Sequence, residues 1–262
     1  MISFFRKIRQ KLLQQNRVTR YLAYALGEIA LVMIGILLAL QVNNWNESRK
    51  QRMVELKYFS NLKNDLNSDL ERLNYMVDFS KGKITAASNM KKRADGDTVG
   101  SLYDFSSDML ILLFVEEFRP NANTYEEMKS SGNFSLIQND EIKVEFMNLR
   151  KTYIDIQAFQ EHLRYDFNVF LQDYEKFINW GKYYNLSKSD VSKGQFLFDS
   201  LYIESNQNEL ELEVKELLKS NIFLNNIFLL EINYGYGLEM YQNTKSQIEE
   251  IIQTLDKELA LE

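Results

Sequence analysis

The sequence has no cysteine, one histidine (His162) and one proline (Pro120). Without cysteine there is no disulfide, no thiolate nucleophile and no cysteine zinc site. A single histidine also excludes metal sites built from several imidazoles. Scarce proline argues for helices and against a loop-rich β architecture. Because 13% of the residues are aromatic, the chain can fill a core. We therefore expect a folded all-α protein with no metal and no cofactor.

The first twenty residues contain no acidic side chain. They hold six basic ones, although the whole chain has a net charge of −6, so the rest of the chain is strongly acidic. Nucleic-acid binding is disfavoured, because the only basic cluster is this short arm. Within the arm, Phe5, Ile8 and Leu12 recur at helical spacing, which is typical of a helix lying on an anionic lipid surface. A retention signal with no structure of its own is the alternative.

A long apolar run follows the arm. From residue 22 to residue 42 the only charged side chain is Glu28, and a helix of this length covers roughly 30 Å, the thickness of a bilayer's hydrocarbon core. Three aromatic residues suit the two membrane interfaces: Tyr21, Tyr24 and Trp45. We predict a transmembrane signal anchor over residues 21–45. A buried core helix is the alternative, and a cleaved signal peptide would have a shorter apolar region.

The basic residues predict the orientation of this anchor. Six precede the span and fewer follow it closely, which favours a cytoplasmic N-terminus. We expect a single-pass protein of a bacterial inner membrane. Residues 1–20 would form a basic amphipathic arm in the cytoplasm, and residues 46–262 a helical domain in the periplasm.

The membrane helix is expected to continue into the first helix of this domain. No glycine or proline occurs between Gly35 and Gly82, and apolar residues recur there at three- and four-residue steps. The first turn signal is "ADGDTVG" (94–100). Ser101 is then expected to cap a second helix, which would end at Pro120 and the asparagines around it.

Three further helices are expected. Thr124 and Glu127 fit the capping box of a short helix closed by Gly132. Asn139 is expected to cap a helix over 140–180 that ends at Gly181. The helical period returns over 209–259, with a bend predicted at "YGYG" (234–237). The segment 222–232 is too short and too polar to span a membrane, so we assign it to the bundle. Helices of this length must bury their apolar stripes together, which predicts an elongated antiparallel bundle.

No motif of catalytic chemistry is present, and we expect the protein not to be an enzyme. His162 has Asp166 one turn ahead and Asp155 two turns behind, without a nucleophile or metal cluster, so we interpret it as structural. The acidic pairs Glu116/Glu117 and Glu126/Glu127 are adjacent in sequence and would point to different helix faces, which makes them poor candidates for paired-carboxylate catalysis.

Small residues line one face of the predicted anchor at steps of four and eight: Ala23, Gly27, Gly35 and Ala39. Such a pattern lets membrane helices approach closely, and Glu28 borders the same face. Intramembrane acids usually face protein or a cavity. We therefore predict a contact with another membrane helix, either of a second copy or of a different subunit. The alternative is that Glu28 is protonated or reaches the interface, in an anchor that contacts only lipid.

A second candidate for a partner contact is "KSSGN" (129–133), which places small and polar residues between two capped helices: Ser130, Ser131, Gly132 and Asn133. The alternative is a simple helix–turn–helix corner.

Two segments resemble a known family. The first is "GEIALVMIGILLALQVNNWNE" (27–47), preceded by "FFRKIRQKLL", and the second is "TYEEMKSSGNFSLIQNDEIK" (124–143). Both resemble blocks of a Bacteroidota family of uncharacterised membrane proteins, domain of unknown function 6090, over most of the chain. The resemblance implies a single-pass membrane protein with an all-helical extracytoplasmic part, and no assigned activity.

Two functions remain open. The first is a membrane-tethered interaction or scaffold module that acts through its bundle. The second is a subunit of an ion-driven or transport complex that uses Glu28 as a protonatable group, by analogy with stator subunits. A periplasmic enzyme or a ligand sensor is less well supported.

Overall fold

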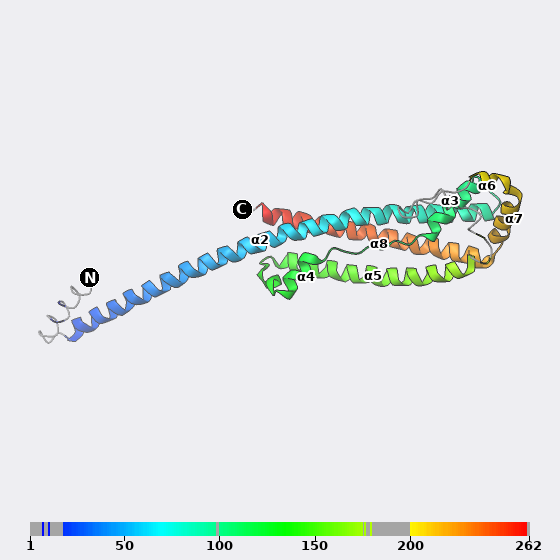
Figure 1. The fold of residues 1–262 in the computed structure, drawn as a ribbon. Helices are drawn as coiled ribbons and strands as arrows, with labels where there is room; N and C mark the ends of the chain where they lie inside the picture. The colour runs from blue at the N-terminus through cyan, green and yellow to red at the C-terminus, as the bar shows by residue number, and fades with distance from the viewer. Residues whose placement is uncertain are drawn as a thin grey trace. The chain divides into compact units, whose positions relative to one another are not determined.

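The computed structural model describes residues 18–97, 100–174 and 200–260, together with the single residues 7, 10, 176 and 179 (Figure 1). The chain divides into two compact units, Met1–Tyr58 and Phe59–Glu262. All regular structure in the described ranges is helical, which confirms the all-α prediction. The helices are α2 (Val18–Ala94), α3 (Leu102–Leu113), α4 (Asn123–Ser130), the 3₁₀ helix η1 (Asn133–Leu136), α5 (Asp140–Tyr174), α6 (Ser200–Ser205), α7 (Gln207–Leu218) and α8 (Asn221–Leu259).

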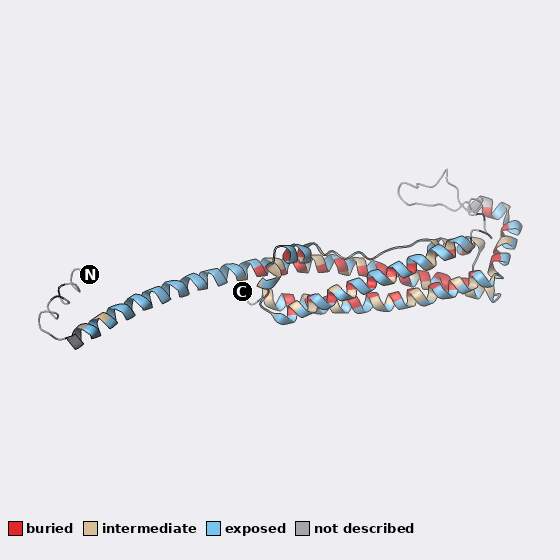
Figure 2. Cartoon of the chain, turned by 90° about the horizontal axis from the view of Figure 1, so that it is seen from below, coloured by how far each residue is buried: buried red, intermediate tan, exposed pale blue. Residues whose placement is uncertain are grey.

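In the first unit, residues 26–42 of α2 are apolar apart from Glu28 and Gln41, and protein does not cover them. Every residue over 26–51 is exposed (Figure 2). Among the described helices, the one that includes Tyr24 is long and apolar enough to cross a membrane, judged by length and composition. Its most apolar stretch of 18 residues has a mean hydropathy of 2.2, and none of it is buried. Because α2 is unbroken, it confirms the prediction that the helix of the apolar run continues past residue 45 into the next helix without a turn.

The second unit is a bundle of three long helices: residues 59–94 of α2, α5 and α8. The helices α2 and α5 are parallel, since Asp69 contacts Tyr153 and Lys83 lies near Phe167, further along both helices. The helix α8 is antiparallel to α2, as shown by the pairs Lys63–Asp256 and Lys91–Glu231.

Buried residues follow the helical period in all three helices, and Figure 2 shows them as stripes along the bundle. In α2 the stripe includes Phe59, Leu66, Leu73 and Met90, each at most 3% exposed. Burying a leucine or phenylalanine side chain stabilises a fold by about 1.5–3 kcal/mol. The hydrophobic effect along these stripes therefore holds the bundle together.

A capping box starts α3, as predicted for Ser101. The Ser101 hydroxyl accepts a hydrogen bond from the Asp104 backbone N–H, and the Asp104 carboxylate accepts one from the Ser101 N–H at 2.7 Å. The helix is held against α2 by Arg93, whose guanidinium pairs with Asp108 at 2.6 Å.

The predicted end of this helix at Pro120 is wrong. The helix ends at Leu113, and an extended segment follows it to residue 122. The Lys83 amine of α2 accounts for the early end, because it donates to the carbonyl oxygens of Leu112 (2.8 Å) and Phe114. Partners on another helix satisfy carbonyls that further helical turns would otherwise occupy.

The predicted capping box of Thr124 and Glu127 is also wrong. Ala122 is the N-cap of α4, and its side chain makes no capping bond. The carboxylate of Asp65, on α2, instead accepts a hydrogen bond from the Thr124 N–H at 2.9 Å. The predicted closure of the helix is confirmed, because Gly132 follows it with φ 77°, a left-handed conformation that glycine adopts without strain.

The last predicted helix, 209–259, is two helices. It breaks at Lys219 and Ser220, where the Ser220 hydroxyl accepts from the Phe223 N–H and caps α8. No break occurs at 234–237. At Gly237 a side chain would place its Cβ 2.8 Å from the Phe159 ring of α5, so this glycine permits close packing of α8 against α5.

Asn139 caps α5 as predicted, since its side-chain oxygen accepts a hydrogen bond from the Glu141 N–H at 2.9 Å. The described part of this helix ends at Tyr174, so its predicted end at Gly181 lies outside the described residues. The predicted assignment of 222–232 to the bundle is confirmed on one face, where Phe223, Ile227 and Leu230 are buried.

Candidate functional site

The extended segment between α3 and α4, residues 114–122, lies along α2 and α5, and we call it the strap. It contacts Lys83, then Arg72, then Asp69 of α2, so it runs opposite to that helix. An extended segment presents backbone N–H and C=O groups that need partners. Side chains of the neighbouring helices provide them at several points of the strap.

Lys83 holds the start of the strap from inside the core. Its side chain is 1% exposed. The amine lies 5.2 Å from the ring centre of Phe79, 5.2 Å from that of Tyr234 and 5.9 Å from that of Phe167. Burial disfavours the ammonium form and lowers the pKa of Lys83 to about 7. The amine therefore contacts the carbonyl oxygens of Leu112 and Phe114 and the faces of these three aromatic rings.

The middle of the strap is held by a buried amide. In the amide orientation that satisfies all its partners, the Gln160 nitrogen donates to the Phe118 carbonyl (3.1 Å). Its oxygen accepts from the Phe118 N–H (2.6 Å) and from the Tyr241 hydroxyl (3.2 Å). Phe118 itself is buried. The Gln160 side chain of α5 therefore pairs with both backbone groups of Phe118, as the backbone of a neighbouring β-strand would.

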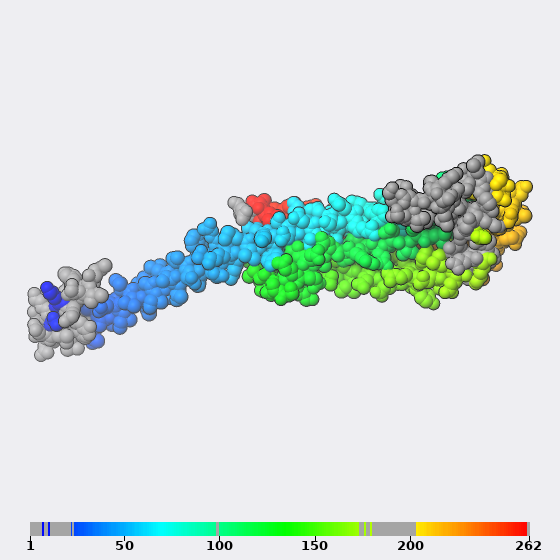
Figure 3. All heavy atoms as spheres, in the orientation of Figure 1, coloured from blue at the N-terminus to red at the C-terminus, as the bar shows by residue number. Residues whose placement is uncertain are grey.

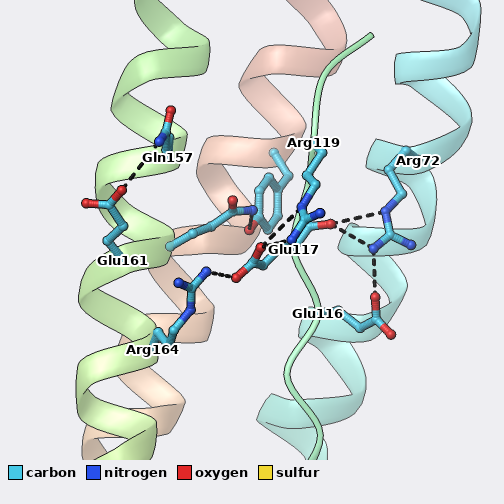
Figure 4. A network of polar contacts seen from close by, with 9 residues as sticks. Arg72, Glu116, Glu117, Arg119, Gln157, Glu161 and Arg164 are labelled. Atoms are coloured by element: carbon cyan, nitrogen blue, oxygen red, sulfur yellow. Dashed lines mark hydrogen bonds and ion pairs between the residues drawn. The ribbon is translucent and has the colours of Figure 1, made fainter.

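Charged residues surround the strap on the surface of the bundle (Figure 4). Arg72 pairs with Glu116 at 2.6 Å and donates to the Glu117 carbonyl at 2.7 Å. The Glu117 carboxylate pairs with Arg164, from α5, and with Arg119 at 3.1 Å. Three arginines and two glutamates from three segments therefore form one network.

Two hollows flank this network. The first has a volume of about 600 Å³, and Arg72, Glu116 and Arg164 are among its lining residues. The second has a volume of about 400 Å³, and Arg119, Arg150 and Arg164 are among its lining residues. Charged groups at the floor of an open hollow suit recognition of a polar or charged surface. In the part of the chain that the structure describes, no three acidic or histidine side chains are placed to hold a metal.

Carboxylates of α2 hold the end of the strap. Asp69 is 2% exposed and accepts from the Asn121 N–H (2.7 Å) and from the Tyr153 hydroxyl (2.6 Å). Burial raises the pKa of Asp69, and these two hydrogen bonds oppose the rise. Burial also raises the pKa of Tyr153, so its hydroxyl remains a donor. Asp65, one turn earlier on α2, holds Thr124.

The predicted intramembrane residues lie on the exposed part of α2. Gly27, Glu28, Gly35 and Ala39 are exposed, as are Tyr24 and Trp45. The backbones of Tyr21 and Ala23 are helical, but their side chains lie outside the described residues. The contact with a second membrane helix therefore stays a prediction.

At the corner "KSSGN" both serine hydroxyls form hydrogen bonds to the backbone of the preceding helix α4. Ser131 donates to the Glu127 carbonyl at 2.7 Å and Ser130 to the same carbonyl at 3.1 Å, while Gly132 makes the turn. These bonds cap the end of α4. A partner contact at Ser130, Ser131, Gly132 and Asn133 stays a prediction.

The other singled-out residues form surface ion pairs. His162 lies 3.3 Å from Asp166, and its side chain is 62% exposed. Glu126 pairs with Arg150 at 3.0 Å. The expectation that Glu116 and Glu117 lie on helix faces is wrong, because they belong to the extended strap.

Sequence reasoning missed Lys83, Asp69 and Gln160. A signal was present for Lys83 and Asp69. In α2, Asp69 and Lys83 occupy positions of the buried stripe that runs through Leu66, Leu73 and Met90. A charged residue in an otherwise apolar stripe indicates a buried partner. The identity of that partner could not be read from the sequence, because it lies on another segment.

Comparison with known proteins places the chain in a family. The model of the family of unknown function DUF6090 matches residues 28–233, so the chain belongs to that family. The matched range includes Glu28, the strap and the residues that hold it. No curated protein and no solved structure matches the chain.

Proposed function

We propose that this protein is a single-pass protein of a bacterial inner membrane, with a helical interaction or scaffold domain in the periplasm. The observation that carries the proposal is the exposed apolar part of α2, with a mean hydropathy of 2.2 and no buried residue in its most apolar stretch. Apolar surface of this extent is unfavourable in water. A lipid bilayer would cover it without any protein partner.

The basic residues support the proposed orientation. Six of them fall in the first twenty residues, which have no acidic side chain. Such segments stay on the cytoplasmic side, while long following domains cross. The second unit would then lie in the periplasm and carry the function.

The strap supports an interaction role for the second unit. It presents Glu116, Glu117 and Arg119 at the surface, between two hollows, and side chains of α2 and α5 hold it in place. A rigid display of charges of both signs favours specific recognition of a partner surface. The first recognition surface to test is therefore the network of Figure 4.

Cysteine labelling in whole cells tests the topology, because the chain has no cysteine of its own. Cysteine is introduced at Ser3 and, separately, at the exposed Ser246, and cells are treated with a membrane-impermeant maleimide. We expect labelling of S246C and no labelling of S3C until the cells are permeabilised. The opposite pattern would refute the orientation.

The alternative function is a subunit of an ion-driven or transport complex that uses Glu28. Its support is the position of this carboxylate, exposed on the apolar part of α2 beside Gly27. The variant E28Q separates the two functions, and G35L tests the predicted assembly in both. If Glu28 carries protons, E28Q is expected to abolish the cellular phenotype while gentle detergent extraction still recovers the assembled complex. If it only bonds a partner, E28Q preserves both, and G35L disrupts assembly in either case.

A further inference from the structure

The helix α5 has a second apolar stripe, on the side opposite to its buried one. The buried stripe includes Ile142, Phe146, Leu149 and Ile156. At about 100° per residue, a second set of residues lies roughly across the helix from these. All of its members are exposed: Val144, Met147, Ile154, Ala158, Tyr165 and Val169.

The exposed stripe has the spacing of a coiled-coil seam. Positions 144, 147, 151, 154, 158, 161, 165 and 168 alternate steps of three and four residues, as the first and fourth positions of a heptad do. A solvent-facing side of a bundle helix is normally polar. Met147 is instead 60% exposed and Tyr165 69% exposed. In the space-filling view the atoms of α5 form one border of the second unit (Figure 3).

Two members of the seam are charged, with opposite signs: Lys151 and Glu161. Both are exposed, and they stand at equal distances in sequence on either side of residue 156. An antiparallel copy of the same helix, related by a twofold axis that crosses the exposed seam at the level of residue 156, would set Lys151 opposite Glu161 of the second copy. The reciprocal pair forms by the same symmetry.

We propose that α5 pairs in this antiparallel way with α5 of a second copy of the chain. Met147 then lies opposite Tyr165 of the second copy, and Ile154 lies opposite Ala158 of the second copy. Each of these two layers joins a larger side chain to a smaller one, and at the ends of the seam Val144 lies opposite Asn168 of the second copy. The paired surface extends about 36 Å along the helix, at 1.5 Å per residue between positions 144 and 168.

The charges select the antiparallel pair over a parallel one. In a parallel pair each seam residue meets its own copy, so Lys151 would face Lys151 and Glu161 would face Glu161, both unfavourable. Beside the antiparallel seam, Arg150 and Arg164 are already paired with Glu126 and Glu117 in their own chain. Asp155 faces its own copy near the axis, a like-charge contact at the exposed rim that weakens the pair.

The interface involves the second unit alone and does not rest on the membrane assignment. Residues 59–94 of α2 run parallel to α5, so the two chains enter the paired bundles from opposite ends.

Disulfide trapping tests the register, with the full chain in mild detergent. In M147C/Y165C the two cysteines face each other across the pair, so mild oxidation is expected to give a covalent dimer in high yield. In a dimer of either single variant, the cysteines of the two copies are offset along the helix axis by 18 residues, roughly 27 Å. Neither M147C nor Y165C alone is therefore expected to crosslink. A parallel pair gives the opposite result, with each single variant crosslinking, and would overturn the proposal.

Charge reversal and a matched control test the interface itself, with the dimer dissociation constant measured by light scattering after size exclusion. K151E is expected to raise this constant about two- to tenfold, and K151E/E161K to restore it. I154K is expected to raise it more than about tenfold, and the exposed Ile232 of α8 supplies the control I232K, which should leave it unchanged. Helicity by circular dichroism is expected to be unaltered in all four. A wild-type chain that stays monomeric at its highest soluble concentration, or equal loss in I154K and I232K, would refute the interface.

Discussion

Two parts of α2, residues 26–45 and residues 59–94, are both helical but differ in how far their side chains are buried. Over residues 26–45 every side chain is exposed, whereas over 59–94 buried positions recur every three to four residues. Leu37 is 59% exposed and Leu73 is 0% exposed. A helix that is apolar on all sides needs an apolar solvent, and a helix with one apolar stripe needs protein neighbours. The comparison shows that the arrangement of apolar residues around the helix distinguishes an uncovered segment from a core segment.

The largest expected effect comes from truncating one leucine in each half of this helix. Leu73→Ala opens a cavity in the bundle core and is expected to lower its free energy of unfolding by about 2–5 kcal/mol. Leu37→Ala is expected to change it by less than about 0.5 kcal/mol, because that side chain contacts no part of the core. Chemical denaturation in detergent, followed by circular dichroism, measures both. Equal losses would mean that residues 26–45 pack against the bundle.

The next effect concerns Lys83, which lies in the buried stripe of α2. Lys83 is buried among Phe79, Phe167 and Tyr234, and its pKa is lowered from 10.5 to about 7. Between these two values the unfolded chain binds the proton and the folded chain does not. The contribution of Lys83 to stability therefore rises with pH, by at most about 1.4 kcal/mol per unit.

The variant Lys83→Met keeps the apolar stem and removes the titration. From pH 7 to pH 9 the wild-type protein is expected to gain roughly 2–3 kcal/mol relative to Lys83→Met. Denaturation at several pH values gives this difference directly. Parallel pH profiles of the two proteins would show that Lys83 keeps its proton throughout, held by the carbonyls of Leu112 and Phe114.

A smaller effect is expected at Asp69 of α2, whose carboxylate accepts a hydrogen bond from the end of the strap. Asp69→Ala leaves the Asn121 N–H and the Tyr153 hydroxyl without their acceptor and is expected to cost about 1–3 kcal/mol. The matched control is Asp78→Ala. Asp78 is 79% exposed and pairs with Lys81 at 3.6 Å, so its loss should cost less than about 0.5 kcal/mol. If the two variants lose the same stability, the Asp69 contacts do not stabilise the fold.

The smallest effect concerns Trp45, at the end of the predicted anchor. Trp45 is one of two tryptophans, with Trp180, so Trp180→Phe leaves it as the only tryptophan emitter. In liposomes we expect lipids brominated near the headgroup to quench Trp45 more strongly than lipids brominated near the chain end, since tryptophan prefers the membrane interface. Uniformly weak quenching would place Trp45 in water, and the predicted anchor would then end before it.

Much of the fold could be predicted from local patterns. The continuous helix past residue 45, the cap at Ser101, the turn at Gly132 and the cap at Asn139 all depend on residues within one or two helical turns. The errors arose where distant residues decide the outcome. Pro120 looked like the end of a helix, yet α3 stops at Leu113 because Lys83, 29 and 31 positions away from its acceptors, takes the carbonyls of Leu112 and Phe114.

The start of α4 shows the same limit. Thr124 and Glu127 fit a capping box, but Asp65, 59 positions before Thr124, satisfies that N–H instead. The candidate site is assembled almost wholly from such distant contacts, which is why sequence reasoning named Glu116 and Glu117 and missed Arg72, Arg164 and Gln160 as their neighbours.

By itself, the sequence determined that this chain is helical, that one part of α2 is apolar on every side, and where α3 and α5 begin. These properties follow from hydrogen bonds and side-chain spacing within a few residues. Only the tertiary structure decided that residues 114–122 are extended, that α2 and α5 hold them, and that one face of α5 remains apolar and uncovered. Those features depend on which segments meet, and the free energy of such contacts belongs to pairs of residues far apart in the chain.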